Sequence, residues 1–337
     1  MATSLFKVIS SEVAATSAAA INYTNASVTS KVIAGTTYLA VVGSTDIGGV
    51  CVDQSGNIYL SDVTKHIILK VSEGGQVRVV AGLANTSGIN GTLTVSCPNA
   101  RFNAPRGLSC DKSGNIYVCD TGNNQIRVIR GDKVSVVAGN GGGASGFADG
   151  VGGAATFSSP YDIAVNNTGV LYVADKSNNS IRKIVDGTVT TWAGSVSGDN
   201  ANVATTTTAL FNAPETIDVD NSGNVYVGDT GNDKVKMVVP RGWVYRFSGS
   251  TDGKAIGHDA FDTQFKSIKG LAVDNSGNVY VIDRNAVSGS RLLRLSQNGV
   301  ANVIADLNSA TSYNDALLGV AVSPAQKLFV VADSTSR

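Results

Sequence analysis

A short segment that ends in aspartate recurs six times along the chain, and it constrains the fold more than any other feature. Each copy is a run rich in β-branched and aromatic residues, such as GNIYVCD or GNVYVGD, and the six runs end at Asp62, Asp120, Asp175, Asp229, Asp283 and Asp333. Successive copies lie 50–58 residues apart. A repeat of this length, with turn residues between its apolar runs, is typical of a small sheet that cannot bury both of its faces alone.

The segment Phe211–Gly249 shows the whole repeating unit. It contains four runs with strand character, TIDV, NVYVGD, KVKMVV and WVYRFSG, and Asn, Asp, Ser, Gly or Pro bounds each of them. Radial repetition of such a sheet leaves only short, protected edges. The sequence therefore predicts an all-β fold, a six-bladed β-propeller of four-stranded antiparallel blades.

Two units carry a family resemblance. Ala100–Gly139 and Ala155–Gly194 follow the pattern P-x-G-h-A-h-D, then G-N-h-Y-V-x-D, then N-x-x-I-R-x-h, and the linker Ala138–Phe157 is also typical. Over nearly its whole length the chain resembles the NHL-repeat β-propeller family. The resemblance implies the fold but does not select a function, because such propellers serve as RNA readers, protein-binding platforms, adhesion modules and metal-dependent lyases or hydrolases.

The two ends of the chain predict how the ring closes. The last copy begins near Leu318 and has only two strands, so Ser4–Ile9 and Tyr38–Gly43 are predicted to supply its third and fourth strands and to cover the exposed edges. The expected organisation is one propeller domain, residues 1–337. Within it, 1–45 hold the closing strands with an insertion at about 10–36, 46–317 hold five full blades with their linkers, and 318–337 hold the inner two strands of the closing blade.

The repeated residues have structural interpretations. Phe102, Phe157 and Phe211 end linkers of the form A-x-F-x-x-P and are predicted to fill the space between blades, each worth about 2–3 kcal/mol by buried area. The strand-ending aspartates occur in every copy, so they are predicted to belong to the hydrogen bonding of the repeat rather than to act in catalysis, with Asp120 and Asp229 capping the turns that follow them. The D-x-S-G-N segments are interpreted as hairpin turns, because they lack the spacing of a calcium loop.

The first residues of the innermost strands are the candidate channel positions. They are Asp46, Arg106, Asp162, Glu215, Lys269 and Leu318. By resemblance to NHL-like amidating lyases and gluconolactonases, Glu215 and Asp162 are weak metal-ligand candidates, with Asn103 and Asn212 nearby. Two of the six positions are basic and one is apolar, and His66 and His258 lie elsewhere, so no catalytic residue and no cofactor are predicted.

Charge disfavours nucleic acid as a partner. The formal net charge is zero and only 15% of the residues are charged. The basic residues cluster on the third strands, where they are interpreted as an ordinary solvated face: Arg127, Arg130, Arg182, Lys183, Lys234, Lys236, Arg291 and Arg294.

Four cysteines lie in the first part of the chain with no zinc-ligand spacing. Cys51, Cys110 and Cys119 are predicted to be buried thiols, and Cys97 to be a surface thiol.

The function is predicted from the classes of protein that these observations leave open. We expect a non-enzymatic interaction or structural propeller that binds other proteins of a larger assembly, or a cell-surface glycan or receptor, such as a bacteriophage capsid-decoration or tail-associated adhesion protein. Its partner is expected to contact one rim and the Ser10–Thr36 insertion. No secretory signal and no membrane-spanning run are recognised. If the protein is not part of a virion, we therefore expect it in the cytoplasm. The alternatives are a calcium-assisted lactonase or lyase with its site in the channel, and an RNA-binding domain.

Overall fold

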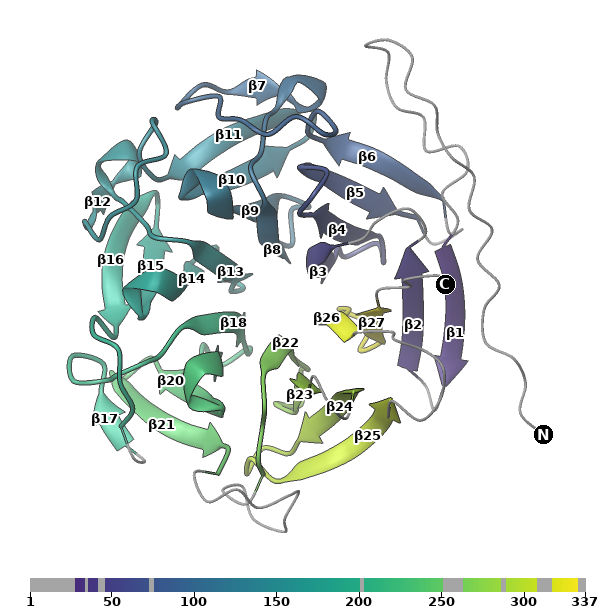
Figure 1. Cartoon of the computed structure of the whole chain (residues 1–337), viewed down its shortest axis with the longest axis vertical. Helices are drawn as coiled ribbons and strands as arrows, with labels where there is room; N and C mark the ends of the chain where they lie inside the picture. The colour runs from purple at the N-terminus through teal and green to yellow at the C-terminus, as the bar shows by residue number, and fades with distance from the viewer. Residues whose placement is uncertain are drawn as a thin grey trace.

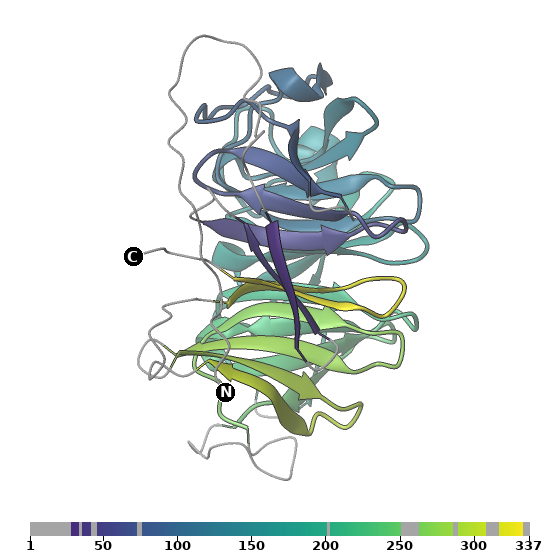
Figure 2. The same cartoon turned by 90° about the vertical axis from the view of Figure 1, so that its right-hand side faces the viewer.

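The chain forms a ring of six sheets around a central axis (Figure 1). The computed structural model describes residues 28–33, 36–41, 46–72, 76–200, 203–250, 263–285, 289–307 and 317–332. Within these ranges the regular elements are strands and three-residue 3-10 helices. The protein is therefore an all-β propeller, seen from its side in Figure 2. No helix in the described ranges is long and apolar enough to cross a membrane.

Five of the sheets are antiparallel blades. Blade one contains β3 (Ile47–Val52), β4 (Ile58–Asp62), β5 (Ile67–Val71) and β6 (Val77–Ala81). Blade five contains β22 (Ile268–Val273), β23 (Val279–Asn285), β24 (Gly289–Leu295) and β25 (Ala301–Leu307). In both blades the first strand lies at the axis and the fourth at the outside (Figure 1).

Blades two, three and four each have a fifth strand. Blade two begins with β8 (Pro105–Cys110), β9 (Ile116–Asp120), β10 (Gln125–Arg130) and β11 (Lys133–Ala138). Blade three begins with β13 (Pro160–Val165), β14 (Leu171–Asp175), β15 (Ser180–Val185) and β16 (Thr188–Ala193). Blade four begins with β18 (Pro214–Val219), β19 (Val225–Asp229), β20 (Lys234–Val239) and β21 (Trp243–Ser248). The long linkers add the outer strands β7 (Val95–Ser96), β12 (Gly150–Val151) and β17 (Val203–Thr205), which pair with β11, β16 and β21. The expectation of four strands in every blade is wrong here, because each linker passes beside the outer strand of the blade it enters.

The sixth sheet joins the two ends of the described chain, and we call it the closing sheet. Its order is β1 (Val28–Ile33), β2 (Thr36–Val41), β27 (Leu328–Ala332) and β26 (Leu317–Val322). β2 runs parallel to β27, with Thr36 opposite Leu328 and Ala40 opposite Ala332. The prediction of six equivalent antiparallel blades is therefore correct only in part, since five sheets have this form and the closing sheet is mixed.

The N-terminal segment also pairs differently from the prediction. The strand that contains Tyr38 lies in the third position, beside β27, and not in the fourth. β1 occupies the fourth position and lies within the predicted insertion at residues 10–36. Ser4–Ile9, the predicted third strand, lies outside the described residues. The parallel pairing still gives the edge of β27 its backbone hydrogen bonds, which is the physical requirement for closure.

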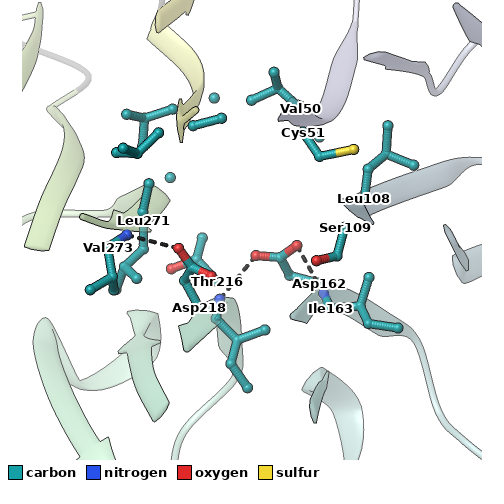
Figure 3. Close-up of a pocket in the computed structure, with 18 of the residues that line it drawn as sticks. Val50, Cys51, Leu108, Ser109, Asp162, Ile163, Thr216, Asp218, Leu271 and Val273 are labelled. Atoms are coloured by element: carbon teal, nitrogen blue, oxygen red, sulfur yellow. Dashed lines mark hydrogen bonds between the residues drawn. The ribbon is translucent and has the colours of Figure 1, made fainter. Parts of the chain in front are cut away.

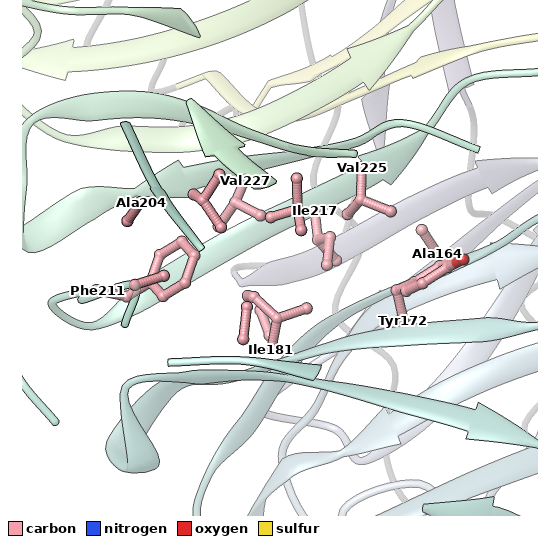
Figure 4. Close-up of a cluster of buried hydrophobic side chains, with 13 residues drawn as sticks. Ala164, Tyr172, Ile181, Ala204, Phe211, Ile217, Val225 and Val227 are labelled. Atoms are coloured by element: carbon pink, nitrogen blue, oxygen red, sulfur yellow. The ribbon is translucent and has the colours of Figure 1, made fainter. Parts of the chain in front are cut away.

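Neighbouring blades pack face to face. Phe211 and Ile217 of blade four and its preceding linker lie in one apolar cluster with Tyr172 and Ile181 of blade three (Figure 4). The linker phenylalanines Phe102, Phe157, Phe211 and Phe265 are all fully buried. At the axis, glycine allows close approach, because a Cβ on Gly49 would lie 2.6 Å from the carbonyl oxygen of Arg106.

The D-x-S-G-N turns join the first strand of a blade to the second. In blade one, Asp53 Oδ1 accepts hydrogen bonds from the backbone N–H groups of Ser55 and Asn57, both at 2.9 Å. Gly56 has φ +79°, a conformation that glycine adopts readily. The hairpin-turn interpretation is confirmed.

Candidate functional site

The innermost strands of the six sheets surround a cavity of about 200 Å³ on the axis (Figure 3). These strands are β3, β8, β13, β18, β22 and β26. Their backbones lie close together, so the cavity is narrow and a few side chains determine its chemistry. Two of those side chains are the carboxylic acids of Asp162 and Asp218.

Asp162 connects two blades. Its Oδ1 accepts a hydrogen bond from the N–H of Ile163 at 2.9 Å, and its Oδ2 accepts one from the N–H of Ile217, on the next innermost strand, also at 2.9 Å. Burial raises the pKa of Asp162 to about 8, and the charge of nearby Asp218 acts in the same direction, against the lowering effect of the two N–H groups. Near neutral pH this group is mainly protonated.

Asp218 makes the same kind of connection one blade further on. Its carboxyl oxygens accept hydrogen bonds from the N–H of Val219 at 2.8 Å and of Val273 at 2.7 Å. Burial raises its pKa to about 6. Between blades two and three the hydroxyl of Ser109 has this role, accepting the N–H of Val165 at 3.1 Å. These three side chains link consecutive innermost strands from β8 to β22 (Figure 3).

Glu215, at the start of β18, lies between two lysines. Its Oε1 lies 2.8 Å from Lys176 Nζ and its Oε2 lies 2.7 Å from Lys269 Nζ. Burial alone would raise the pKa of Glu215, but the two ammonium groups outweigh it and lower the pKa. Glu215 is therefore a buried anion that is already paired.

The predicted ligand set does not fit a metal ion. Both oxygens of Asp162 accept backbone N–H groups and both oxygens of Glu215 contact lysines, so a cation would have to compete with these partners. Asn103 and Asn212 instead donate their amides to the carbonyls of Gly122 and Gly231. In the described ranges no group of three or more His, Cys, Asp and Glu residues is arranged to hold a metal.

The remaining channel positions give mixed chemistry. Arg106 Nη1 donates to the hydroxyl of Tyr161 at 3.0 Å, and the Arg106 guanidinium and the Lys176 ammonium both lie over the Tyr161 ring, at 4.6 and 4.5 Å. The backbone oxygen of Asp46 accepts the N–H of Val63. The side chain of Leu318 lies outside the described residues.

The strand-ending aspartates anchor linkers rather than cap turns. Asp120 accepts the backbone N–H of Asn103 at 2.7 Å, and the next turn, Thr121–Asn123, has no side-chain cap hydrogen bond. The same arrangement is found at Asp175 and Asp229, and Asp283 accepts two linker N–H groups. The prediction that Asp120 and Asp229 cap the following turns is wrong, although Oδ2 of each accepts the side-chain amide of an asparagine in that turn, Asn123 and Asn232. Asp62 does receive the N–H of Lys65, at 2.9 Å, and Asp333 lies outside the described residues.

Four of the eight basic residues of the third strands are buried, which corrects their interpretation as a solvated face. Arg127 and Arg182 are fully buried, and Lys234 and Lys236 are nearly so. They pair with aspartates: Arg127 with Asp120, Arg182 with Asp175 and Asp149, Lys234 with Asp199, Lys236 with Asp229 and Asp199, and Arg291 with Asp283. Arg127, Arg182 and Lys236 also lie over the rings of the linker phenylalanines, at 5.1–5.3 Å. Buried cations of this kind cannot meet the phosphates of RNA, whereas Arg130 and Arg294 are exposed.

The cysteines differ from the prediction in two respects. Cys51 on β3 and Cys110 on β8 form a disulfide at the channel, with Cα atoms 6.0 Å apart, so they are not thiols. Their sequence separation of 59 residues is about one repeat, and this signal places both on the first strands of consecutive blades. Cys97, predicted at the surface, is buried, as is Cys119.

Known proteins resemble this chain in its repeats. Residues 44–185 match the family described as Teneurin NHL domain. Human NHL repeat-containing protein 2 is 29% identical over 224 residues, which cover 57% of this chain and 29% of that protein. Teneurin-3 from Danio rerio is 28% identical over 222 residues, which cover 56% of this chain and 8% of that protein. The alignments therefore span less than a third of these relatives.

Solved structures resemble it in fold. A gluconolactonase from Xanthomonas campestris has a TM-score of 0.57 at 14% identity, covering 86% of this chain and 84% of its own. A catalytically inactive virginiamycin B lyase from Staphylococcus aureus with quinupristin has a TM-score of 0.55 at 12% identity, covering 86% and 78%. Such low identities concern the fold alone. The repeat pattern, the ring of sheets and the sequence relatives together support the assignment of the chain to the NHL-repeat β-propellers.

Proposed function

We propose that this chain is a non-catalytic interaction propeller. One observation carries the proposal: each carboxyl oxygen of Asp162 and Glu215, the acidic candidates at the channel, already has a partner within the protein. A general base or a metal ligand must be free to reach a substrate or an ion. A role in binding other proteins agrees with the resemblance to NHL-repeat propellers, which include protein-binding platforms.

The outer strands offer apolar surface to a protein partner. Val203 and Trp243 lie on the paired strands β17 and β21 and are 54% and 45% exposed. Leu93 and Val151, in the two preceding linkers, are 67% and 66% exposed. Val203 and Trp243 lie on neighbouring strands of one blade and are the candidate contact, whereas Leu93 and Val151 belong to two other blades.

The experiment identifies what co-purifies with the native protein and which segment holds it. Deleting residues 10–36 would remove β1, so we choose the shorter deletion of residues 10–27, which leaves both closing strands in place. We expect that deletion, or Trp243→Ser, to release the partner while thermal unfolding stays unchanged. An unchanged set of partners in both variants would contradict the proposal.

A narrower proposal is that the partner is a large assembly such as a bacteriophage virion, with the chain on the capsid surface or the tail. It is supported by the zero net charge and the abundance of Gly, Ser, Thr and Asn. Co-sedimentation of the chain with purified particles tests it. Recovery of the chain only from the soluble cytoplasmic fraction would exclude this location.

The second candidate is a calcium-assisted lactonase or lyase, favoured by the fold likeness to the gluconolactonase and the virginiamycin B lyase. It requires calcium in the purified protein and hydrolysis or elimination that is lost in Glu215→Ala. Because Glu215 is held by Lys176 and Lys269, we expect neither. Activity on a lactone that depends on Glu215 would replace the interaction proposal with this one.

A further inference from the structure

A chain of side-chain amides crosses one face of the propeller. Asn167 Nδ2 donates to Asn221 Oδ1 at 2.8 Å, and Asn221 Nδ2 donates to Asn275 Oδ1 at 3.0 Å. The backbone N–H of Asn275 donates to Gln326 Oε1 at 2.9 Å. Each residue lies in the turn between the first two strands of its sheet, so the chain runs from blade three to the closing sheet.

A second cavity, of about 360 Å³, lies beside this chain between blades four and five, and we call it the inter-blade cavity. The turns of the two blades form its walls with small polar side chains, Asn221, Ser222, Asn224, Asn275, Ser276 and Gln297. Tyr226 and Met237 also line it, and Tyr226 is only 4% exposed. Its volume falls near the lower end of the range for small-molecule sites, about 300–1,000 Å³.

The lining carries one charged group among its described residues. Its single carboxylate among the described lining residues, Asp220, accepts the N–H groups of Ser222 and Asn224 at 2.8 Å through Oδ1. Its Oδ2 accepts the amide of Asn224 at 2.8 Å and the hydroxyl of Tyr226 at 3.4 Å. An anionic ligand would be repelled by this carboxylate, and a cation would have to displace hydrogen bonds that Asp220 already accepts, so an ionic partner is disfavoured.

Several polar groups of the lining remain available. Among the described residues, Asn275 Nδ2, Gln297 Oε1 and the hydroxyls of Ser222 and Ser276 have no hydrogen-bond partner in the protein. The Gln297 side chain is fixed at its other end, because its Nε2 donates to the carbonyl of Ser276. The cavity thus presents amide donors, amide acceptors and hydroxyls together.

We propose that the inter-blade cavity binds a neutral saccharide. Sugar hydroxyls both donate and accept hydrogen bonds, as do the amides and hydroxyls that line this cavity. An extended peptide would need a free strand edge or apolar pockets for alternate side chains, and the walls here are turns with mostly polar side chains. This site is separate from the central channel and from the apolar outer strands, so its failure would leave the protein-binding proposal intact.

The test measures binding of neutral mono- and oligosaccharides to the full chain by saturation-transfer NMR and calorimetry. Ser276→Ala and Gln297→Ala remove lining groups, and both residues are exposed, so the fold should tolerate the changes. Ser55→Ala is the matched control for Ser276→Ala, because Ser55 has the equivalent turn position in blade one. Gln54, in the same turn of blade one, is the control for Gln297, because Gln54→Ala makes the same chemical change. Loss of one neutral hydrogen bond should weaken binding about three- to tenfold in the lining variants only.

Ionic strength provides an independent readout. Affinity for a neutral ligand should stay constant as salt rises from about 0.05 M to about 0.5 M, a range over which exposed ion pairs are screened. Failure of every saccharide to bind at about 10 mM would overturn the proposal, since a Kd above that value corresponds to a binding free energy of less than about 3 kcal/mol. Equal weakening of binding in the lining and control variants would also overturn the proposal. So would saturable binding of a peptide library that is lost in Gln297→Ala, if no sugar binds.

Discussion

The guanidinium of Arg182 lies 2.8 Å from the carboxylate of Asp175, and neither side chain is exposed to solvent. Asp175 ends the second strand of blade three, and Arg182 lies on the third strand, over the ring of Phe157 at 5.2 Å. Asp175 also accepts the N–H of Ser158 at 2.8 Å. One buried ion pair therefore fixes the linker, the phenylalanine and two strands together.

Removing one partner of this pair should destabilise the propeller strongly. Arg182→Met leaves the Asp175 charge buried without its cation, and we expect a loss of about 3–5 kcal/mol in the free energy of unfolding. Lys183→Met, half-buried on the same strand, is the control and should change little. Urea unfolding measures both. Similar losses in the two variants would show that the pair does not act as described.

How far the sequence predicts this arrangement depends on the range of each interaction. The period, the hairpin turns and the burial of Phe157 follow from local pattern, because alternation and turn chemistry involve neighbouring residues. The pairing of Arg182 with Asp175 does not follow from local pattern. A basic residue on a third strand usually faces water, and here the linker covers it.

For the candidate channel site, the sequence predicts only which residues lie on the innermost strands. Register places Asp162 on an innermost strand, but its bond to the N–H of Ile217 depends on how closely two blades approach, which the sequence does not encode locally. Asp218 was missed because its role also appears only between blades, although a lone acid in the apolar run TIDV was the available signal. The parallel pairing of β2 with β27 joins residues nearly 300 positions apart and has no local signal.

The disulfide between Cys51 and Cys110 should be detectable chemically. Of the four cysteines, we expect two to react with iodoacetamide in denaturant without reductant, and all four after reduction. Closing a loop between residues 59 apart should stabilise the fold by about 4 kcal/mol through the entropy of the unfolded chain. Cys51→Ala should therefore lower stability and abolish sensitivity to reductant, whereas Cys119→Ala should keep that sensitivity. Labelling of all four thiols before reduction would refute the disulfide.

Stability should fall as pH rises from about 4 to about 8. Burial raises the pKa of Asp162 to about 8 and of Asp218 to about 6, from 3.8. Between the unfolded and folded pKa values the native state binds more protons, so its stability is greatest below the unfolded pKa and is lost progressively up to the folded pKa.

Asp162→Thr tests which group is responsible. Threonine occupies the equivalent position, Thr216, of the next innermost strand, so it should fit there. The variant should lose most of the decline above pH 6, while the part that belongs to Asp218 and to Asp120, whose pKa burial also raises to about 6, remains below it. Urea unfolding at several pH values gives the slope. An unchanged slope above pH 6 would rule out titration of Asp162.

Closure of the ring should depend on β2 rather than on the residues before β1. Deleting residues 1–45 removes β1 and β2 and leaves the edge of β27 without the hydrogen bonds that it makes to Thr36–Ala40. An uncovered strand edge is a template for pairing with other chains, so we expect a lower unfolding temperature and aggregation. Deleting residues 1–27 keeps both strands and should preserve the unfolding temperature. Equal stability of the two deletions, measured by calorimetry and light scattering, would mean that the ring does not need its N-terminal strands.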